Sequence, residues 1–456
     1  MERENAELKA TVAALLKRIE GLEARLAQNS SNSSRPPSSD PPSLPPKPER
    51  EPSGRKRGGQ PGHDKHKRVL LPPERVKSVT QCVPKGCRGC GDALSGIDPE
   101  PLVHQVFEVP RLAAYADEYH LHRLYCPRCG ITTQGPLPVG VPSTGLGPRL
   151  EAMLGVLSGK YRLSKRLLAE LCADAFDIDI SIGAVCDAQQ RVSDAVAEPA
   201  AEAHEAIQVA AVVHADETSW REAKHKAWLW VAATTTLAVF LIRRRRNGDV
   251  AKELLGAHFC GRLITDRWAA YNFVHYLRRQ LCWAHLKRDF KSFLDHGAEG
   301  RRIGNALEEA RKCLFRQWRR VRDGTIQRST LRANARPIQR QICDLLREGI
   351  HCPSGKVSGM CREILSAQHS LFTFITCEGV EPTNNHGEQT IRHAVMWRKV
   401  CFGTDSECGS RFAERILTVV QSLRMQNRNV LDFVSTACEA RLLGIKPPSL
   451  LPATAA

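Results

Sequence analysis

The sequence predicts an α/β multidomain protein built around a mixed β-sheet. The chain has 456 residues, enough for about three domains at roughly 150 residues each. Helical periodicity marks residues 1–28 and 148–205, whereas short apolar runs typical of strands begin at Ile207. Hydrophobic residues make up 42% of the chain, so a sizeable core is expected and wholesale disorder is excluded.

Charge and cysteine content narrow the class of protein. The chain has 66 Lys and Arg against 49 Asp and Glu, a net charge of +17, which favours a nucleic-acid partner. No run approaches the roughly 18 apolar residues of a membrane span, and the charged start MERENAELKA does not fit a signal peptide. We therefore expect a cytoplasmic protein with no membrane partner. In that reducing compartment, the 17 cysteines are metal ligands or buried side chains more often than disulfides.

The first 28 residues carry a heptad pattern of apolar side chains. Their spacing alternates between four and three residues, which is typical of a coiled-coil seam formed by Leu8, Val12, Leu15, Ile19, Leu22 and Leu26. Asn5 shares the frame of Val12 and Ile19, where a polar residue can select register or partner number. We expect residues 1–28 to join subunits into a homo-oligomer. The alternative is an isolated amphipathic helix packed on the body.

Residues 29–77 predict a disordered basic linker. They are rich in Ser, Pro, Gly, Lys and Arg and almost lack apolar side chains, so they bury too little surface to offset the entropy of ordering. Residues 47–77 hold ten Lys and Arg against four acids, a net +6. One interpretation of a cluster such as Arg55, Lys56 and Arg57 is a solvated tail with no binding role. Because a cysteine module follows it, we expect these residues to contact the DNA backbone.

Residues 78–140 predict a structural zinc module. Two Cys-x-x-Cys pairs are separated by 35 residues, and the candidate ligands are Cys87, Cys90, Cys126 and Cys129. Each pair of thiolates can hold one face of a Zn²⁺ ion, and two pairs complete a tetrahedral site with no open position for water. Alternation over residues 115–125 predicts a strand leading into the second pair. The alternative is four buried cysteines without metal.

Residues 148–205 predict helices. The stretch from Tyr161 to Val192 reads as helix, turn and helix, with Ser181 as the N-cap of the second helix. Such a pair is either a helix-turn-helix that reads DNA bases or a helical hairpin that braces the next domain. The second helix carries little positive charge, so base reading is the weaker interpretation.

Residues 206–396 hold acids in positions suited to metal binding. Two apolar strands are expected to end in Asp216 and Asp266, and such carboxylates lie side by side if the strands are neighbours. Magnesium prefers a few hard oxygen ligands of this kind. A third acid, Glu388, lies on a predicted helix and shares a face with Ile391 and Arg392. Arg392 is a candidate phosphate contact. The alternative is that these acids only cap strands and helices.

Other polar residues near these motifs have weaker claims. Strand alternation points Glu217 away from Asp216, so we expect it to be solvated or salt-bridged, and Glu381 precedes a proline in a predicted loop. His285 and Arg288 on a predicted helix are candidates for phosphate or acid contacts. The alternative for His285 is a packed core residue beside Trp283. Asp289 is a competing acid near these motifs, and we expect Trp268 and Tyr271 to be core residues.

Four segments resemble the motifs of the insertion sequence 66 family of bacterial transposases: HADET, ITDRWAAY, LCWAHLKRDF and PTNNHGEQTIR. The resemblance extends to the zipper-like start, the RGGQPGH linker, the cysteine module and residues 397–440. The last of these lie in a predicted C-terminal helical segment and tail, 397–456. It implies an RNase H-like catalytic domain with a helical insertion at about 295–370 and a DDE triad formed by Asp216, Asp266 and Glu388. The pair His386 and Gly387 departs from the family pattern, which leaves the start of that helix open.

The resemblance implies a DNA transposase that uses two Mg²⁺ or Mn²⁺ ions. Such an enzyme would hydrolyse phosphodiesters at the element ends and transfer the 3′-hydroxyl strand into target DNA. Its partners would be terminal repeats, target DNA and small accessory proteins of the same element, and it would act at the bacterial nucleoid. Two alternatives remain: a non-catalytic zinc and helix-turn-helix regulator, and an RNase H-like nuclease without strand transfer.

Overall fold

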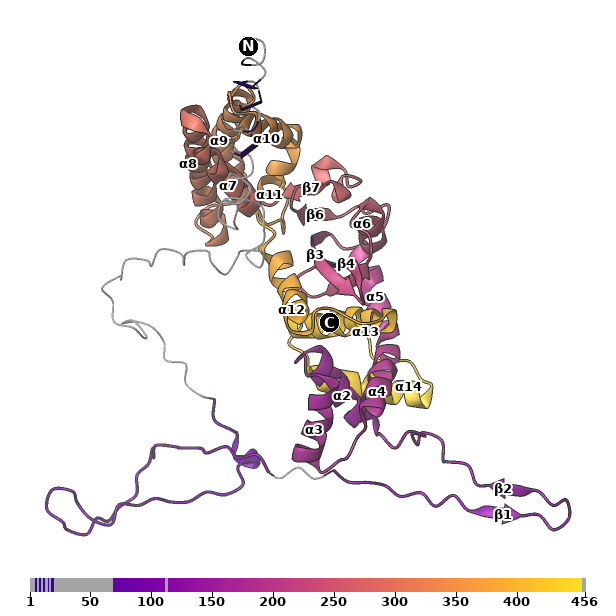
Figure 1. Cartoon of the computed structure of the whole chain (residues 1–456). Coiled ribbons are helices and arrows are strands. Elements are labelled where there is room, and N and C mark those ends of the chain that lie inside the picture. The colour runs from indigo at the N-terminus through magenta and orange to yellow at the C-terminus, as the bar shows by residue number, and fades with distance from the viewer. Residues whose placement is uncertain are drawn as a thin grey trace. The chain divides into compact units, whose positions relative to one another are not determined.

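The computed structural model describes residues 69–110 and 114–452, together with eight helical positions near the start of the chain (Figure 1). Those eight are Asn5, Leu8, Lys9, Thr11, Val12, Leu15, Arg18 and Ile19. Four of the predicted seam residues are among them, and each is about half exposed or more, from 49% to 65%. Leu22, Leu26 and the basic residues Arg55, Lys56 and Arg57 lie outside the described residues.

A five-stranded mixed sheet is the centre of the larger of two units into which the chain divides. Its strands are β3 (Val212–Glu222), β4 (His225–Ala233), β5 (Ala238–Arg243), β6 (Arg262–Thr265) and β7 (Arg279–Leu281). They lie in the order β5-β4-β3-β6-β7. The first three strands form an antiparallel meander, whereas β6 runs parallel to β3 and β7 runs parallel to β6. The apolar runs that predict strands therefore form one mixed sheet.

The register of the parallel strands brings the first two predicted acids together. His214 of β3 pairs with Ile264 of β6, so Asp216 and Asp266 each lie two residues beyond a paired position on neighbouring strands. The prediction that the first strand ends at Asp216 was wrong, because residues 217–222 continue to pair with β4 in the hairpin. Only the parallel pairing ends before the acids.

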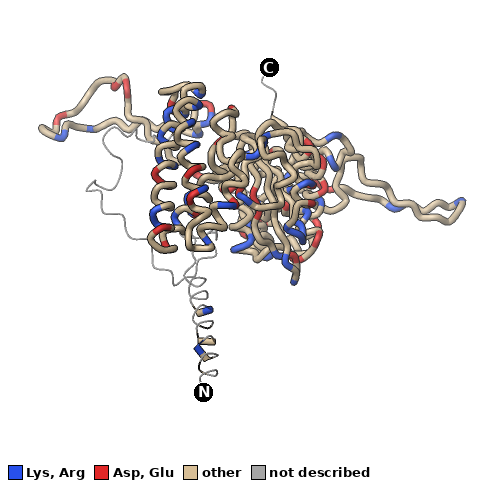
Figure 2. Tube along the Cα trace, turned by 90° about the horizontal axis from the view of Figure 1, so that it is seen from above, with Lys and Arg blue, Asp and Glu red and all other residues tan. Residues whose placement is uncertain are grey.

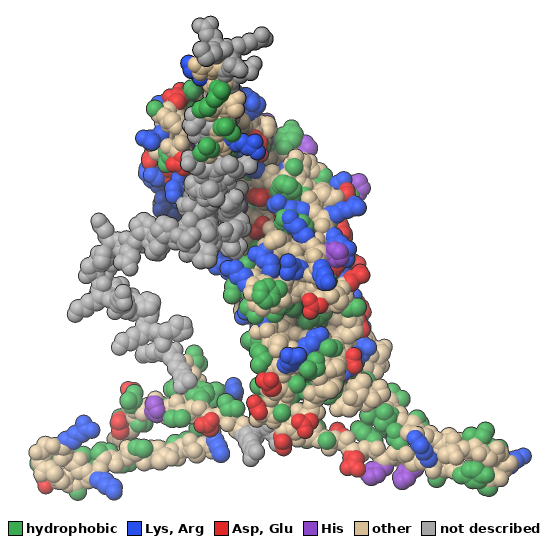
Figure 3. Space-filling model, in the orientation of Figure 1, with side chains coloured by type: hydrophobic (Ala, Val, Ile, Leu, Met, Phe, Trp, Pro, Cys, Tyr) green, Lys and Arg blue, Asp and Glu red, His purple; other side chains and the backbone are tan. Residues whose placement is uncertain are grey.

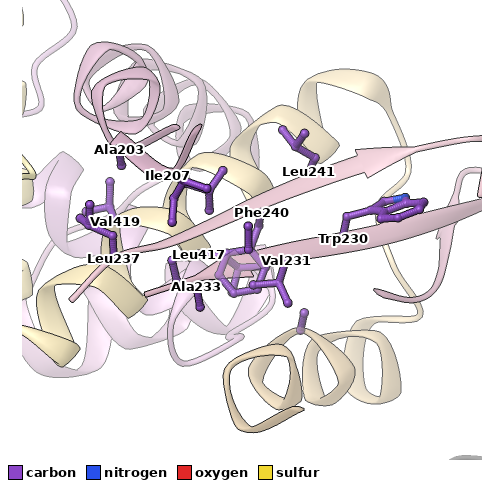
Figure 4. Packing of buried hydrophobic residues seen from close by; sticks show 14 of the residues in the cluster. Ala203, Ile207, Trp230, Val231, Ala233, Leu237, Phe240, Leu241, Leu417 and Val419 are labelled. Atoms are coloured by element: carbon purple, nitrogen blue, oxygen red, sulfur yellow. The ribbon is translucent and has the colours of Figure 1, made fainter. Parts of the chain in front are cut away.

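Helices from both ends of this unit pack on the sheet. Helix α12 (Asn385–Cys401) contacts β3 and β4, and α5 (Ala197–Gln208) and α13 (Glu407–Met425) contact β5. Figure 4 shows their shared core, in which Ile207, Phe240 and Leu417 lie close together. Helix α12 runs past residue 396, where we expected the catalytic domain to end, so the C-terminal segment shares the core of the sheet.

Helix α13 covers the open edge of the sheet. Alternate amides of β5 donate hydrogen bonds to side chains one turn apart on α13: Ala238 to Ser422 (3.0 Å), Phe240 to Thr418 (3.1 Å) and Ile242 to Glu414. Two residues of a strand and four residues of a helix both span about 6–7 Å, so the spacing of the β5 amides equals that of the α13 side chains. These contacts satisfy amides that would otherwise invite pairing with another strand.

A helical insertion separates β7 from α12. It contains α7 (Trp283–Ser292), α8 (Gly297–Arg322), α9 (Arg328–Gly349), α10 (Gly355–Ser366) and the short α11 (Thr373–Thr376). These helices have their own apolar core, which includes Phe290, Leu307 and Leu346, and Leu281 of β7 joins it. The insertion is thereby fixed to the edge of the sheet that carries β6 and β7.

The helices before the sheet form a bracing layer. Helices α2 (Pro148–Gly159), α3 (Lys165–Phe176) and α4 (Ile182–Ala195) precede α5, and α2 packs against α14 (Val430–Leu443). Ser181 caps α4, as predicted, by accepting a hydrogen bond from the Ala184 amide at 3.1 Å. The only basic residue of α4, Arg191, pairs with Glu151 at 2.6 Å, which fits a bracing role better than base reading. No described helix is long and apolar enough to cross a membrane.

Candidate active site

Asp216, Asp266 and Glu388 come from three different elements at the carboxyl ends of the parallel strands. Asp216 lies within β3, Asp266 directly follows β6, and Glu388 lies in the first turn of α12. All three residues are only partly buried. Each aspartate also accepts a nearby backbone N–H at 2.9 Å, from Glu217 and Trp268 respectively. These bonds fix the aspartates and leave carboxylate oxygens available for a ligand.

Asn384 ties α12 to the sheet. Its side-chain amide donates to the carbonyl of Ala215, next to Asp216, at 2.8 Å, and its Oδ1 contacts Nδ1 of His214 at 3.1 Å. Its backbone N–H donates to Sγ of Cys282 at 3.1 Å, and its carbonyl accepts from the Glu388 amide at 3.0 Å. Asn384 thus connects β3, the end of β7 and the helix that carries Glu388.

Gly387 allows this connection to form. A Cβ at residue 387 would lie 2.8 Å from Oδ1 of Asn384, closer than real contacts permit, and 3.0 Å from its Nδ2. The neighbouring His386 is held by a short contact: its Nε2 lies 2.6 Å from the carbonyl oxygen of Thr234. The two residues that depart from the family pattern are therefore accommodated, and α12 begins at Asn385.

The electrostatics of the site reflect the gathering of its acids. Burial raises the pKa of Asp216 well above its usual range, and the charges of Glu217, Asp266 and Glu388 raise it further. The pKa of Glu388 is also raised, mainly by burial. The charge of Asp266 adds to this rise, whereas the charges of Arg288 and Arg392 oppose it. Carboxylates that raise one another's pKa in this way favour binding of a cation.

Glu217 is part of a rigid support for the site rather than a solvated residue. Its side chain is 1% exposed, and it pairs with Arg246 at 2.7 Å and accepts a hydrogen bond from Tyr271 at 2.6 Å. The Arg246 guanidinium stacks between Trp228 and Trp268, 4.6 and 4.0 Å from the ring centroids. The salt-bridged alternative for Glu217 is confirmed. Tyr271 is fully buried, as predicted, yet it also holds this acid.

A second group of possible ligands surrounds Glu388. Sγ of Cys282 and Nδ1 of His285 lie 4.0 and 3.6 Å from Oε1 of Glu388. Among the described residues, only these three offer His, Cys, Asp or Glu ligand atoms that all lie within 4.8 Å of one another, so the three predicted acids are more widely spread. Burial and Arg288 lower the pKa of His285 to about 4. The imidazole is therefore neutral near pH 7.

The remaining candidates near the site have distinct positions. The positive charges of Arg288 on α7 and of the exposed Arg392 on α12 both lower the pKa of Glu388. Asp289 pairs with Arg267 at 2.9 Å, so this competing acid already has a cationic partner. Glu381 lies in the loop before α12, as predicted.

The insertion carries a cationic surface. Residues 311–348 contain eleven Lys and Arg against three acids, and Lys and Arg recur along these helices in Figures 2 and 3. Among residues 311–348, all of which the structure describes, five arginines are exposed without an ion pair or hydrogen bond: Arg316, Arg320, Arg322, Arg336 and Arg340. Others are engaged; Arg328, for example, donates to the Cys377 carbonyl at 2.8 Å. The five exposed arginines are the candidates for contact with phosphates.

The two Cys-x-x-Cys pairs have the same local structure. The amides of Cys87 and Cys126 donate to carbonyls five residues on, at 2.8 and 2.9 Å, and their carbonyls accept from Gly91 and Gly130 at 2.9 Å. Both glycines have positive φ, 83° and 72°. Backbone N–H groups of the second cysteine in each pair, and of the residue before it, lower the pKa of Cys87 and of Cys126, which favours thiolates.

The predicted strand before the second pair is shorter than expected. Only β1 (Arg123–Tyr125) forms, pairing with β2 (Thr132–Gln134) across Cys126 and Cys129. Tyr115 is 90% exposed, so the alternation of residues 115–122 marks no buried face. The two pairs belong to different units of the chain, and a shared zinc site remains a prediction.

Sequence reasoning missed two features of the site. Asn384 was not singled out as a candidate, because its bonds reach residues about 170 positions away. Cys282 was not considered, although its spacing from His285 in LCWAH is the signal that could have identified it, since two ligands at that spacing can share a metal ion.

Comparison with known proteins identifies the family. Residues 147–411 match the Transposase IS66 family. This match covers more than half of the chain, so the chain belongs to that family. Residues 1–69 match a family of unknown function, DUF6444.

One relative is similar over part of its length. It is the uncharacterized protein y4qI of Sinorhizobium fredii, which is 25% identical over 237 residues. The matched region covers 46% of this chain and 43% of that protein. The chain therefore spans less than half of the relative's length.

Proposed function

We propose that this protein is a DDE-type DNA transposase with an RNase H-like core. The observation that carries the proposal is the register of β3 and β6, with Asp216 and Asp266 each two residues beyond the His214 and Ile264 pair. Glu388 completes the triad from α12. Membership of the Transposase IS66 family supports DNA as the substrate.

The donor set suits hard divalent cations. Carboxylate oxygens are the ligands that Mg²⁺ and Mn²⁺ prefer. Burial raises the pKa of Asp216, and the charges of the neighbouring acids raise it further; bound cations would balance those charges. A spread of ligands wider than 4.8 Å suits two ions about 3.5–4 Å apart better than one. When bound, two such ions supply a water-derived nucleophile and stabilise the attacking and leaving oxygens.

The residues of the chain orient these groups and bind DNA. Asn384 and the Glu217–Arg246 pair hold the acids in fixed positions, while Arg288 and Arg392 are available to DNA phosphates. Hydrolysis would break a phosphodiester at the element end and leave a 3′-hydroxyl. That hydroxyl would then attack a target phosphodiester, forming one P–O bond and releasing one target 3′-oxygen. No covalent protein intermediate is required.

The other parts would position the DNA and pair the subunits. The helical, exposed Leu8, Val12, Leu15 and Ile19 support a coiled coil that brings two element ends together. Matching turns and lowered pKa values at Cys87 and Cys126 support one structural Zn²⁺ held by both cysteine pairs. Terminal repeats, target DNA and small accessory proteins of the element are the proposed partners.

A strand-transfer assay tests the proposal. The full chain is incubated with Mg²⁺, DNA carrying the two element ends, and a target plasmid. Joined products are expected. Cleavage without joining would favour the nuclease alternative, and DNA binding with neither reaction would favour the regulator.

A further inference from the structure

Three side chains with different donor atoms converge at the start of α12. Cys282 offers sulfur, His285 nitrogen and Glu388 oxygen, and all three ligand atoms lie within 4.8 Å of one another. Cys282 follows β7 directly and is 1% exposed, whereas the side chains of His285 and Glu388 are 21% and 35% exposed. The group is thus anchored on one side and accessible on the other.

The imidazole nitrogen that faces Glu388 lacks a partner. Within the described residues, Nδ1 of His285 is buried without a hydrogen bond, and its 3.6 Å separation from Oε1 of Glu388 is too long for one. An unsatisfied buried polar atom destabilises the folded protein. A cation between the two atoms would satisfy both.

The distances are close to those of a tetrahedral site. Bonds of about 2.0–2.1 Å from zinc to nitrogen and oxygen place those two ligands about 3.3–3.4 Å apart. The observed separation is 3.6 Å, and that from Sγ of Cys282 to Oε1 of Glu388 is 4.0 Å. Closure by a few tenths of an ångström would suffice. The sulfur is already oriented, because it accepts the Asn384 amide at 3.1 Å.

We infer that Cys282, His285 and Glu388 form a site for Zn²⁺ or a transition-metal ion of similar chemistry, separate from the all-carboxylate site. Sulfur and imidazole ligands select such ions over Mg²⁺, and three protein ligands leave a fourth position open. Because Glu388 belongs to both sites, an ion held here withdraws it from the acid triad. Zinc would then inhibit Mg²⁺-dependent DNA cleavage, a consequence that rests on the proposed function.

Metal binding is tested first, without reference to activity. Full-length protein is purified without chelator, so that the proposed zinc site at the two Cys-x-x-Cys pairs stays filled. It is then titrated with Co²⁺, and the thiolate-to-cobalt charge-transfer absorption is recorded. The wild type should gain one cobalt–thiolate band that Cys282→Ser lacks, and His285→Gln should bind cobalt about tenfold more weakly or worse. Cys260→Ser, which removes an exposed thiol, should match the wild type. An unchanged band in Cys282→Ser, or no band in the wild type, would overturn the site.

Inhibition is tested second. Zn²⁺ is titrated into the Mg²⁺-dependent cleavage reaction of the wild type, Cys282→Ser and Cys260→Ser. The midpoint for inhibition should rise about tenfold or more in Cys282→Ser alone. Equal midpoints in all three proteins would refute the inhibitory role. A wild type that binds cobalt as expected but never cleaves DNA would instead refute the transposase assignment and leave the metal site standing.

Discussion

Replacing Gly387 with alanine should uncouple α12 from the sheet. The added Cβ would lie 2.8 Å from Oδ1 of Asn384, and that side chain cannot simply rotate, because it is bonded to Ala215 and contacts His214. Losing two buried hydrogen bonds costs about 2 kcal/mol, and the stranded groups raise this to as much as about 5 kcal/mol. The gain in helix propensity offsets up to about 1 kcal/mol.

A matched control separates these effects. Gly359 lies within α10 and a Cβ there meets nothing within 4 Å, so Gly359→Ala should be neutral or stabilising by up to about 1 kcal/mol. Urea unfolding followed by tryptophan fluorescence suits the comparison, because all seven tryptophans lie between residues 220 and 397. Gly387→Ala should be less stable than Gly359→Ala by about 2–5 kcal/mol. Equal unfolding midpoints would refute the role given to Asn384.

Three further predictions concern pH, salt and the sheet edge. Burial lowers the pKa of His214 from 6.5 to about 4. Between these pH values the unfolded chain binds a proton at this residue and the folded chain does not. The stability that His214 contributes above pH 6.5 is therefore lost as the pH falls toward 4. Urea unfolding should show about 2 kcal/mol less stability at pH 5 than at pH 7 from this residue, and His214→Gln should reduce that loss; an identical loss would count against the burial argument. Arg316→Ala with Arg320→Ala should weaken DNA binding and lower the salt slope by about 2, measured by fluorescence anisotropy at several salt concentrations, whereas an unchanged slope would assign these arginines to a solvated face. Thr418→Val leaves the Phe240 amide without its acceptor and should lower the free energy of unfolding by about 1–3 kcal/mol; a wild-type urea midpoint would show that this edge contact contributes little.

Local sequence patterns predicted the strands and helices of the site but not which of them lie next to one another. Apolar runs ending in acids located the strands, and the capping residue Ser181 located a helix start, because these signals depend on neighbouring residues. The adjacency of β3 and β6 depends on pairing between residues 50 positions apart, His214 and Ile264. No local periodicity specifies that pairing.

The side chains that support the acids were harder to predict. Alternation placed Glu217 on the opposite face from Asp216, which left its surroundings open. Its burial depends on Arg246, which is held between two tryptophan rings contributed by β4 and by the turn after Asp266. Asn384 likewise acts through contacts with a strand about 170 residues earlier. Such contacts are tertiary, so a single sequence gives no direct signal of them.

The most direct test of the central claim is the rate of Mg²⁺-dependent cleavage of the element ends by isosteric variants of the three acids. Asp216→Asn, Asp266→Asn and Glu388→Gln preserve side-chain size and remove the charge that would hold the cations. Each variant should bind the DNA as tightly as the wild type yet cleave it no faster than the reaction without metal. Wild-type cleavage by any one of them would contradict the assignment of that residue to the metal site.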